Sequence, residues 1–392
     1  MRRTRLLAAC AALWAFNPGL APGVSAQEPA RVIPVYLVPR DLSFPMQGVV
    51  YNARVVADVR AWYGRVLGGR TFDYEPLVVQ ESRHTFAQLA ADSFQAWWPL
   101  LQNEFADYGW PWNKRSKFKL LFLTHGAGAW AGSDSENGGL DSTNQAGKVD
   151  KGNWGGLAVI GDSSVTGVFA KVCPEVAHGK ADSTIATAWW CSGSTYRGTV
   201  AHELGHTWGL PHPDAFTKGF RCADSTAYTI MQCHWWWEKE RLLPYEIVHL
   251  RSLDFFKFDT AAAYVLLAET KALPVVRARS SVLERGDSVT WVDGRGAGTG
   301  YPWAVVLDGA GARAEYAVSG TTLAFDLGLE RGSVGPSQLR VDLDGKPAGL
   351  FAVEPGQAPG RFTLALHGAR RITLRITHGT GRVVLGNARV WR

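Results

Sequence analysis

The stretch from Thr199 to Asp214, TVAHELGHTWGLPHPD, constrains the fold more than any other part of the chain. It contains the pattern H-E-x-x-H-x-x-G-x-x-H, which is filled by His202, Glu203, His206, Gly209 and His212. Residues four apart lie on one face of a helix, so a helix here places the imidazoles of His202 and His206 side by side. Glycine tolerates positive φ at a helix C-terminus, so Gly209 lets the chain leave the helix sharply and bring His212 back to the same place.

Three imidazoles that meet in this way favour a divalent metal. Neutral imidazole is the commonest side-chain metal ligand, and a catalytic zinc has three protein ligands and one open position for water. Glu203 follows the first histidine and can accept a proton from that water as it attacks a carbonyl group. A bare H-E-x-x-H also arises by chance on helix surfaces, but the glycine and the third histidine make the pattern specific. We therefore predict a zinc site formed by His202, His206 and His212, with Glu203 as the general base.

A second motif follows about twenty residues later, at the spacing of a methionine turn. Tyr228 to Gln232 reads YTIMQ and contains Met231, one of three methionines in the chain. With this turn, the chain resembles the metzincin clan of zinc endopeptidases over about thirty-five residues. The resemblance implies the same three zinc ligands and the same base, and it makes Met231 the hydrophobic floor beneath the metal. Some metzincins place a tyrosine two positions after the methionine, where this chain has Cys233, so the subfamily stays open.

The N-terminus has the features of a secretory signal peptide. A basic MRRTR start precedes the apolar run Leu6–Phe16, and Val24–Ala26 resembles a cleavage site with small residues. Leu7–Cys10 resembles a lipoprotein cleavage box, but the apolar stretch before Cys10 is too short for one. The apolar run is also shorter than the roughly twenty residues that a spanning helix needs. We predict a signal peptide at 1–26 and a secreted, extracellular or periplasmic, chain without a transmembrane segment.

Composition is typical of a folded protein without a nucleic-acid partner. Apolar residues make up 46% and charged residues 19% of the 392 positions, as in ordinary globular chains. Loss of the signal peptide removes three arginines and no acid, so the net charge falls from +6 to +3. The chain has no basic run interleaved with aromatic residues, which argues against binding to nucleic acid. We expect a protein or glycoprotein substrate instead.

Four cysteines remain after removal of the signal peptide: Cys173, Cys191, Cys222 and Cys233. An even number of cysteines in an exported chain predicts two disulfide bonds, with three possible pairings. Pairing of nearest neighbours would brace the segments on either side of the zinc helix. Free buried thiols are the alternative.

Residues 27–265 are predicted to form an α/β (α+β) catalytic domain. Their hydrophobic pattern predicts strands at 31–39, 72–81, 117–124 and 154–161, and helices at 49–67, at 85–108 and after Leu243. Alternating strands and helices favour a mostly parallel sheet covered by helices, and the metzincin resemblance implies the same fold. The resemblance also implies that the strand at 154–161 is an antiparallel sheet edge that pairs with extended substrate, and an interior strand is the alternative.

Residues 126–153 form a polar segment between these elements. Its carboxylates, Asp134, Glu136, Asp141 and Asp150, could supply oxygen ligands to Ca²⁺, but their spacing matches no known calcium loop. We therefore predict a solvated surface loop, and the sequence lends Ca²⁺ binding no support.

The pattern of residues 270–392 changes to short apolar strands separated by turns, which predicts an all-β sandwich or jelly roll. Asp344-Gly345 is a strong hairpin signal. Residues 337–391 resemble the last part of the NPCBM carbohydrate-binding module, through the elements V-x-x-D-G-K, G-x-x-x-I-T-L-x-I and N-A-x-V-W. The resemblance implies sugar binding through residues that it does not identify. A structural or protein-binding sandwich is the alternative.

Two functions are compatible with these features. The first is a secreted zinc endopeptidase whose C-terminal domain directs it to glycoproteins. The second is a secreted glycan-binding or adhesive protein with a vestigial zinc site. The presence of Glu203 favours the first, because a decayed site has no need of the base.

Overall fold

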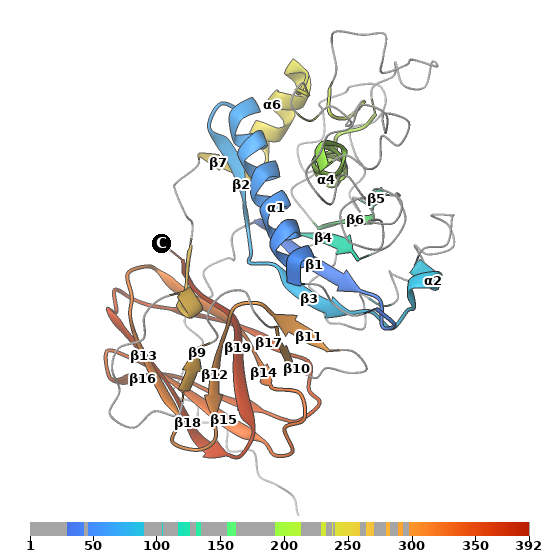
Figure 1. Ribbon diagram of the computed structural model, residues 1–392. Coiled ribbons are helices and arrows are strands. Elements are labelled where there is room, and N and C mark those ends of the chain that lie inside the picture. Colours follow the sequence, from blue (N-terminus) through green and yellow to red (C-terminus); the bar gives the residue numbers. More distant parts are fainter. Residues whose placement is uncertain are drawn as a thin grey trace, which may run out of the picture.

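The computed structural model describes residues 30–42, 46–89, 104, 117–125, 131–134, 155–161, 193–212, 229–232, 237, 240–258, 264–269, 280–282, 289–292 and 298–391. These residues are mostly β-strands with few helices (Figure 1). The N-terminal part, residues 30–258, forms a nine-stranded sheet together with two strands from residues 290–301. The C-terminal part, residues 264–391, forms a six-stranded and a four-stranded sheet. Among the described helices, none is long and apolar enough to span a bilayer. The predicted signal peptide and all four predicted disulfide cysteines lie outside the described residues.

Four parallel strands form the middle of the nine-stranded sheet. β1 (Arg31–Val38) lies between β3 (Val78–Glu81) and β4 (Phe118–Thr124), and β6 (Gly156–Gly161) follows β4. Every residue of β1 is buried, because side chains alternate between two faces of the sheet and both faces are covered. The strands predicted at 31–39 and 117–124 are confirmed.

Other strands extend this sheet at both ends. β5 (Ala131–Asp134) pairs antiparallel with β6 and ends the sheet among the described strands, so β6 is an interior strand. β5 lies in the segment predicted as a surface loop, where glycines and polar residues hide any strand periodicity. At the other end, β10 (Thr290–Val292) and β11 (Thr299–Tyr301) form a hairpin that pairs with β3. The sequence pattern predicts both strands as part of the C-terminal sandwich, because a strand of three residues does not reveal which sheet it joins.

The segment predicted as one strand at 72–81 is two strands. β2 (Arg70–Tyr74) and β3 both pair with β1, but in different registers. Pro76 lies between them and has no N–H for a ladder hydrogen bond, so the sheet breaks there. β2 also pairs with β7 (Phe256–Phe258).

Helices α1 (Met46–Val66) and α4 (Gly193–Thr207) lie on one face of this sheet (Figure 1). One hydrophobic cluster joins the helices to that face, and it includes Val32, Tyr36 and Val38 of β1, Val55 and Val59 of α1, and Val200 and Leu204 of α4. The helices predicted at 49–67 and after Leu243 are confirmed as α1 and α6 (Pro244–Ser252). Of the helix predicted at 85–108, the structure describes α2 (Phe86–Leu89) and Glu104.

The opposite face of the sheet packs against the C-terminal part of the chain. Ile33, Val35 and Leu37 of β1 share a hydrophobic cluster with residues of β12 (Ala304–Asp308) and β19 (Arg382–Trp391). A continuous core therefore joins the two parts of the chain. The boundary predicted between residues 265 and 270 stays a prediction.

The C-terminal part contains two packed sheets. The six-stranded sheet contains β8 (Tyr264–Leu266), β9 (Ser280–Val282), β12, β14 (Thr322–Leu329), β17 (Gly360–Ala365) and β19. The four-stranded sheet contains β13 (Arg313–Ala317), β15 (Ser337–Leu343), β16 (Lys346–Val353) and β18 (Arg371–Gly379). Inward-facing side chains of both sheets form one hydrophobic cluster. The predicted hairpin is confirmed, because Asp344 and Gly345 both have positive φ between β15 and β16.

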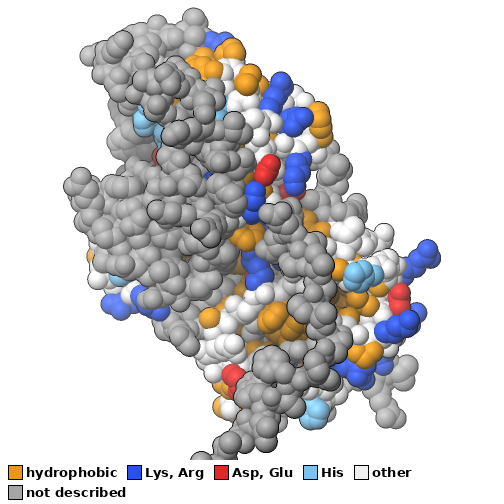
Figure 2. All heavy atoms as spheres, turned by 180° about the vertical axis from the view of Figure 1, so that it is seen from behind, with side chains coloured by type: hydrophobic (Ala, Val, Ile, Leu, Met, Phe, Trp, Pro, Cys, Tyr) orange, Lys and Arg blue, Asp and Glu red, His pale blue; other side chains and the backbone are white. Residues whose placement is uncertain are grey.

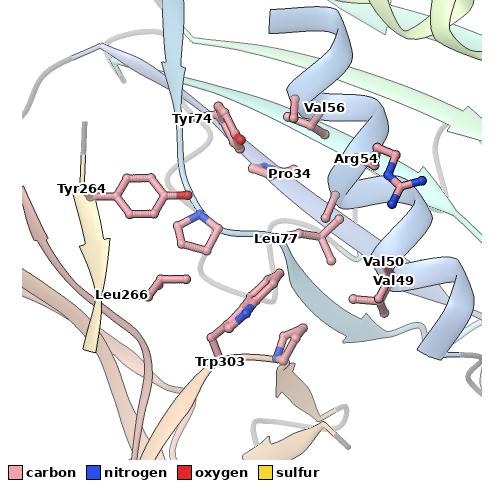
Figure 3. Close-up of a pocket in the computed structure, with 14 residues that line it drawn as sticks. Pro34, Val49, Val50, Arg54, Val56, Tyr74, Leu77, Tyr264, Leu266 and Trp303 are labelled. Carbon is pink, nitrogen blue, oxygen red and sulfur yellow. The ribbon is translucent and has the colours of Figure 1, made fainter. Parts of the chain in front are cut away.

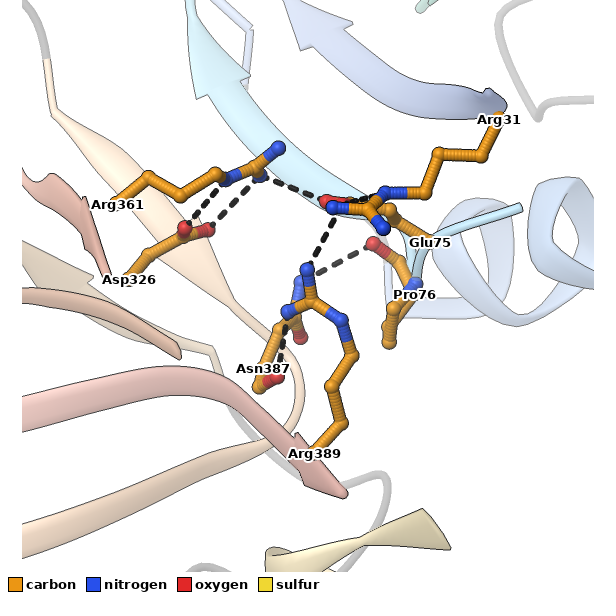
Figure 4. A network of polar contacts seen from close by, with 7 residues as sticks. All are labelled: Arg31, Glu75, Pro76, Asp326, Arg361, Asn387 and Arg389. Atoms are coloured by element: carbon orange, nitrogen blue, oxygen red, sulfur yellow. Dashed lines mark hydrogen bonds and ion pairs between the residues drawn. The ribbon is translucent and has the colours of Figure 1, made fainter. Parts of the chain in front are cut away.

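A buried network of charged side chains lies where the two parts meet (Figure 4). Glu75, in the break between β2 and β3, forms ion pairs with Arg31 at 2.6 Å, Arg361 at 2.7 Å and Arg389 at 2.8 Å. Arg361 also pairs with Asp326 at 3.0 Å. Burial raises the pKa of Glu75, but the three arginines outweigh burial and lower that pKa to about 2. The network therefore holds β1 and the sandwich together through an ionised carboxylate.

We predict that Glu75→Gln destabilises the protein far more than Glu81→Gln. The first change leaves two buried arginines, Arg31 and Arg389, and the partly buried Arg361 around a neutral amide, which costs about 3–5 kcal/mol of unfolding free energy. The second weakens a partly exposed ion pair, Glu81 to Arg331 at 2.6 Å, which joins the same two parts and contributes less than about 1 kcal/mol. Urea unfolding at pH 7 measures both losses. Equal losses would contradict a special role for the buried network.

Candidate metal centre

The end of α4 turns the chain back on itself, as the sequence predicts. Gly209 has a φ of 88°, in the left-handed region that glycine tolerates. Its N–H donates to the carbonyl of His206 at 2.8 Å, and the N–H of Leu210 donates to the carbonyl of Gly205 at 3.1 Å. These two bonds are the Schellman arrangement of a helix C-terminus. They direct the next residues toward the histidine face of α4.

The Nε2 atoms of His202, His206 and His212 converge within 3.0–3.1 Å of one another. The Nδ1–H of His202 donates to the carbonyl of Ile230 at 2.8 Å, and that of His206 donates to the carbonyl of Leu210 at 2.7 Å. A carbonyl can only accept, so both rings carry their proton on Nδ1 and present an Nε2 lone pair to the other histidines. Such lone pairs repel one another unless a cation lies between them. Tetrahedral zinc, with bonds of about 2.0–2.1 Å, separates its nitrogen ligands by roughly 3.3 Å, so this donor set fits zinc.

The local environment keeps these imidazoles neutral. Burial, together with the neighbouring His212, lowers the pKa of His206 to about 4. Burial also lowers the pKa of His212. Because a metal binds only the deprotonated ring nitrogen, protons compete weakly for this site at neutral pH.

The site has a buried side and an open side. His202 and Glu203 are both buried, and Glu203 is 7% exposed. His206 is half-buried and His212 is exposed. The predicted base is therefore shielded from bulk water, whereas the histidine cluster is open to solvent on the side of His212.

The turn that contains Met231 lies against α4. Met231 is fully buried, and a Cβ built at Gly205 would come within 2.5 Å of its sulfur. The preceding residue, Ile230, supplies the carbonyl that orients His202. This turn therefore contacts both the helix and one of the predicted ligands.

A buried carboxylate on α6 holds this turn in place. One oxygen of Glu246 accepts hydrogen bonds from the Thr229 hydroxyl at 2.6 Å and from the Leu243 N–H at 2.7 Å. Burial raises the pKa of Glu246 to about 7, although both hydrogen bonds oppose this shift. Sequence analysis missed this residue, because a glutamate in the first turn of a helix is an ordinary capping residue.

Two further side chains support α4 from outside the motif. Lys119, buried on β4, donates from Nζ to the carbonyl of Thr207 at 2.6 Å, in the last turn of the helix. A cation is favoured there by the helix dipole, although burial lowers the pKa of Lys119 to about 7. Tyr63 of α1 donates its hydroxyl to the carbonyl of Ala201 at 2.8 Å. The sequence pattern gave no sign of either contact, since both join residues far apart in the chain.

No protein-family profile and no curated protein matches this sequence. Similar solved structures include the M60 catalytic domain with the CBM51-1 and CBM51-2 domains of Clostridium perfringens ZmpB, of which only the carbohydrate-binding domains align (9% identity, 33% of this chain, 15% of that chain, TM-score 0.28). They also include CBM51 of Clostridium perfringens GH95 in complex with methyl-galactose (14% identity, 32% and 99% covered, TM-score 0.29). OgpA from Akkermansia muciniphila is similar along most of its length (13% identity, 92% and 93% covered, TM-score 0.33). At these identities and TM-scores, the similarities assign neither a fold nor a function to this chain.

We predict that Glu246 makes the protein less stable at pH 8 than at pH 5. The pKa of its carboxyl rises from the ordinary 4.5 to about 7 on folding, so the folded chain binds this proton more tightly. The resulting stabilisation is complete below pH 4.5 and is lost as the pH rises through 7, by about 2–3 kcal/mol. Glu246→Gln should remove this part of the pH dependence. Thermal unfolding of both proteins at several pH values tests this, and identical pH profiles would contradict it.

We predict that Gly205→Ala displaces Met231 and weakens the metal centre. The added methyl group meets the Met231 sulfur in a packed core, which costs about 1–3 kcal/mol of stability. Disturbing the turn that orients His202 should weaken zinc binding at least about tenfold. Gly64→Ala on α1 is the matched control, because its Cβ would only touch the Thr71 Cβ at 3.7 Å. Thermal unfolding and zinc competition with a chelator measure both effects, and equal behaviour of the two variants would contradict the prediction.

Proposed function

We propose that this chain is a zinc-dependent endopeptidase with a metzincin-like catalytic domain. His202, His206 and His212 would hold the metal. The convergence of their Nε2 atoms, with two Nδ1 protons committed to backbone carbonyls, is the observation that carries this proposal. Zinc bound there supplies a Lewis acid that polarises a scissile carbonyl and acidifies water. The parallel strands beneath α4 and the turn at Met231 also support this assignment.

The protein side chains then perform the proton transfers. Glu203 removes the proton of the attacking water with its carboxylate and later delivers that proton to the leaving amine nitrogen. The carbonyls of Ile230 and Leu210 hold two rings in the tautomer that presents Nε2. Because these contacts exist before any substrate binds, little reorganisation remains for the reaction itself.

An extended peptide substrate fits best beside β5. This strand ends the sheet among the described residues and lies next to α4, which carries the histidines. A peptide can add to such a strand through main-chain hydrogen bonds. The sequence offered the strand at 154–161 as one place for substrate to pair. Because that strand, β6, is an interior strand, we place the substrate pairing at β5, residues 131–134.

The C-terminal sandwich selects the substrate class in this proposal. Its sequence resemblance to the NPCBM module makes secreted glycoproteins the first substrates to test, and the predicted signal peptide would deliver the enzyme to them. A sandwich beside the catalytic part would raise the local concentration of a glycosylated substrate. A glycan-binding protein with an inactive metal site is the competing function.

We predict one zinc per chain in the purified protein. Elemental mass spectrometry should find zinc in the wild type and in Glu203→Ala, and much less in His212→Ala. With zinc retained, Glu203→Ala should cleave casein or mucin about 10²–10⁴-fold more slowly than the wild type.

The outcomes separate the two functions. Equal cleavage by both proteins, or none by either on a broad panel despite bound zinc, would favour the glycan-binding protein. Enzymatic removal of glycans from mucin tests the substrate class separately. Unchanged cleavage of the deglycosylated protein would mean that the sandwich does not select glycoproteins.

A further inference from the structure

A cavity of about 330 Å³ lies between α1 and the C-terminal part of the chain (Figure 3). We call it the junction cavity. Its walls come from α1, from Tyr74, Pro76 and Leu77 around the break between β2 and β3, and from Tyr264, Leu266 and Trp303 of the C-terminal part. No residue of the metal centre lines it. Its volume falls within the range of small-molecule sites, which often lie between domains.

The walls of the junction cavity are rigid and mostly apolar. They contain three prolines and three aromatic residues, namely Pro34, Pro76, Pro302, Tyr74, Tyr264 and Trp303. Proline rings and packed aromatic rings have few conformations, so the cavity keeps its shape without a ligand. Val50 also lines the cavity, and 46% of it is left exposed to solvent. An apolar ligand would cover that surface.

One cation stands at the rim of this cavity. Among the described residues that line the cavity, Arg54 is the only charged one, and it is exposed to solvent on α1. It forms no ion pair with any residue that the structure describes. Within the cavity, the Tyr264 hydroxyl points toward the middle (Figure 3). Tyr74 and Trp303 add a hydroxyl and an indole N–H to the lining. All four of these side chains can donate a hydrogen bond, and only Arg54 is charged, which favours a ligand with one negative charge at the mouth.

We propose that the junction cavity binds a small amphipathic carboxylate, with its apolar body among the prolines and rings and its anionic group at Arg54. Removal of water from the apolar walls supplies most of the affinity, and the guanidinium selects the charged end. A sugar suits the site poorly, because a polyol needs acceptors as well as donors, and no carboxylate or carboxamide side chain lines the walls in the described part of the chain. Arg54 likewise repels a cation. A medium-chain fatty acid is the simplest ligand with the required chemistry.

The test measures displacement of the fluorescent anion 8-anilinonaphthalene-1-sulfonate from the full-length protein by decanoate. We expect the dye to saturate one site, decanoate to displace it, and decanol to displace it more weakly. Arg54→Gln should weaken decanoate binding about tenfold, the loss expected for one charge-assisted contact. Arg65→Gln is the matched control, because it removes the same charge from an exposed position of α1 that does not line the cavity. The affinity of Arg65→Gln for decanoate should stay within about twofold of the wild-type affinity.

A second variant tests the location of the site. Val50→Trp places a large side chain at the mouth, and since Val50 is half-exposed the protein should still fold, which thermal unfolding checks. It should reduce binding of both dye and decanoate. The proposal is wrong if binding never saturates, if Val50→Trp leaves it intact, or if Arg54→Gln and Arg65→Gln behave alike. It is also wrong if methyl galactoside displaces the dye better than decanoate does. These readouts do not involve the metal centre, so they stand whether or not the chain is a peptidase.

Discussion

The ionised carboxylate of Glu75 fixes how the two parts of the chain are positioned against each other. It faces Arg31 of the first strand and two arginines, Arg361 and Arg389, from the sandwich. Three guanidinium groups meet only two carboxylates here, so the buried network carries a net positive charge. Aromatic rings compensate for part of that charge: Arg31 lies 5.1 Å from the Phe118 ring centre and 4.9 Å from that of Trp391. Since buried ion pairs add little net stability, the main effect of the network is to fix one relative position of β1 and the sandwich.

That position matters for both sites, because α1 stands between them. One side of α1, at Val50 and Arg54, lines the junction cavity. Another side contacts α4, the helix that carries His202 and His206. There the Tyr63 hydroxyl donates to the Ala201 carbonyl, and Asn52 accepts a hydrogen bond from the Tyr196 hydroxyl at 2.8 Å. The same helix therefore forms a wall of one site and a support of the other. A structure in which β1 shifted against the sandwich would change the cavity directly and the metal centre through α1.

The features that could be predicted from the sequence are those that depend on near neighbours in the chain. The helix end at Gly209 and the Asp344-Gly345 hairpin follow from backbone preferences of single residues, and both are observed. The three histidines lie within eleven consecutive residues, so helix periodicity and one turn suffice to bring them together. By contrast, β5 and the β10–β11 hairpin depend on partners that no short pattern reveals. A strand of three or four residues is compatible with several sheets, and only the complete fold selects one.

The contacts that orient the three histidines also depend on residues far apart in the chain. A peptide of residues 199–214 alone would contain every predicted ligand and the base, and it would be too short to hold a stable helix in water. It would also lack the Ile230 carbonyl that fixes the His202 ring, as well as the carboxylate of Glu246 that holds the turn carrying this carbonyl. Lys119 reaches the end of α4 from a strand 88 residues earlier. The motif thus specifies which atoms meet, whereas the orientation of those atoms is a property of the whole sheet and its two covering layers.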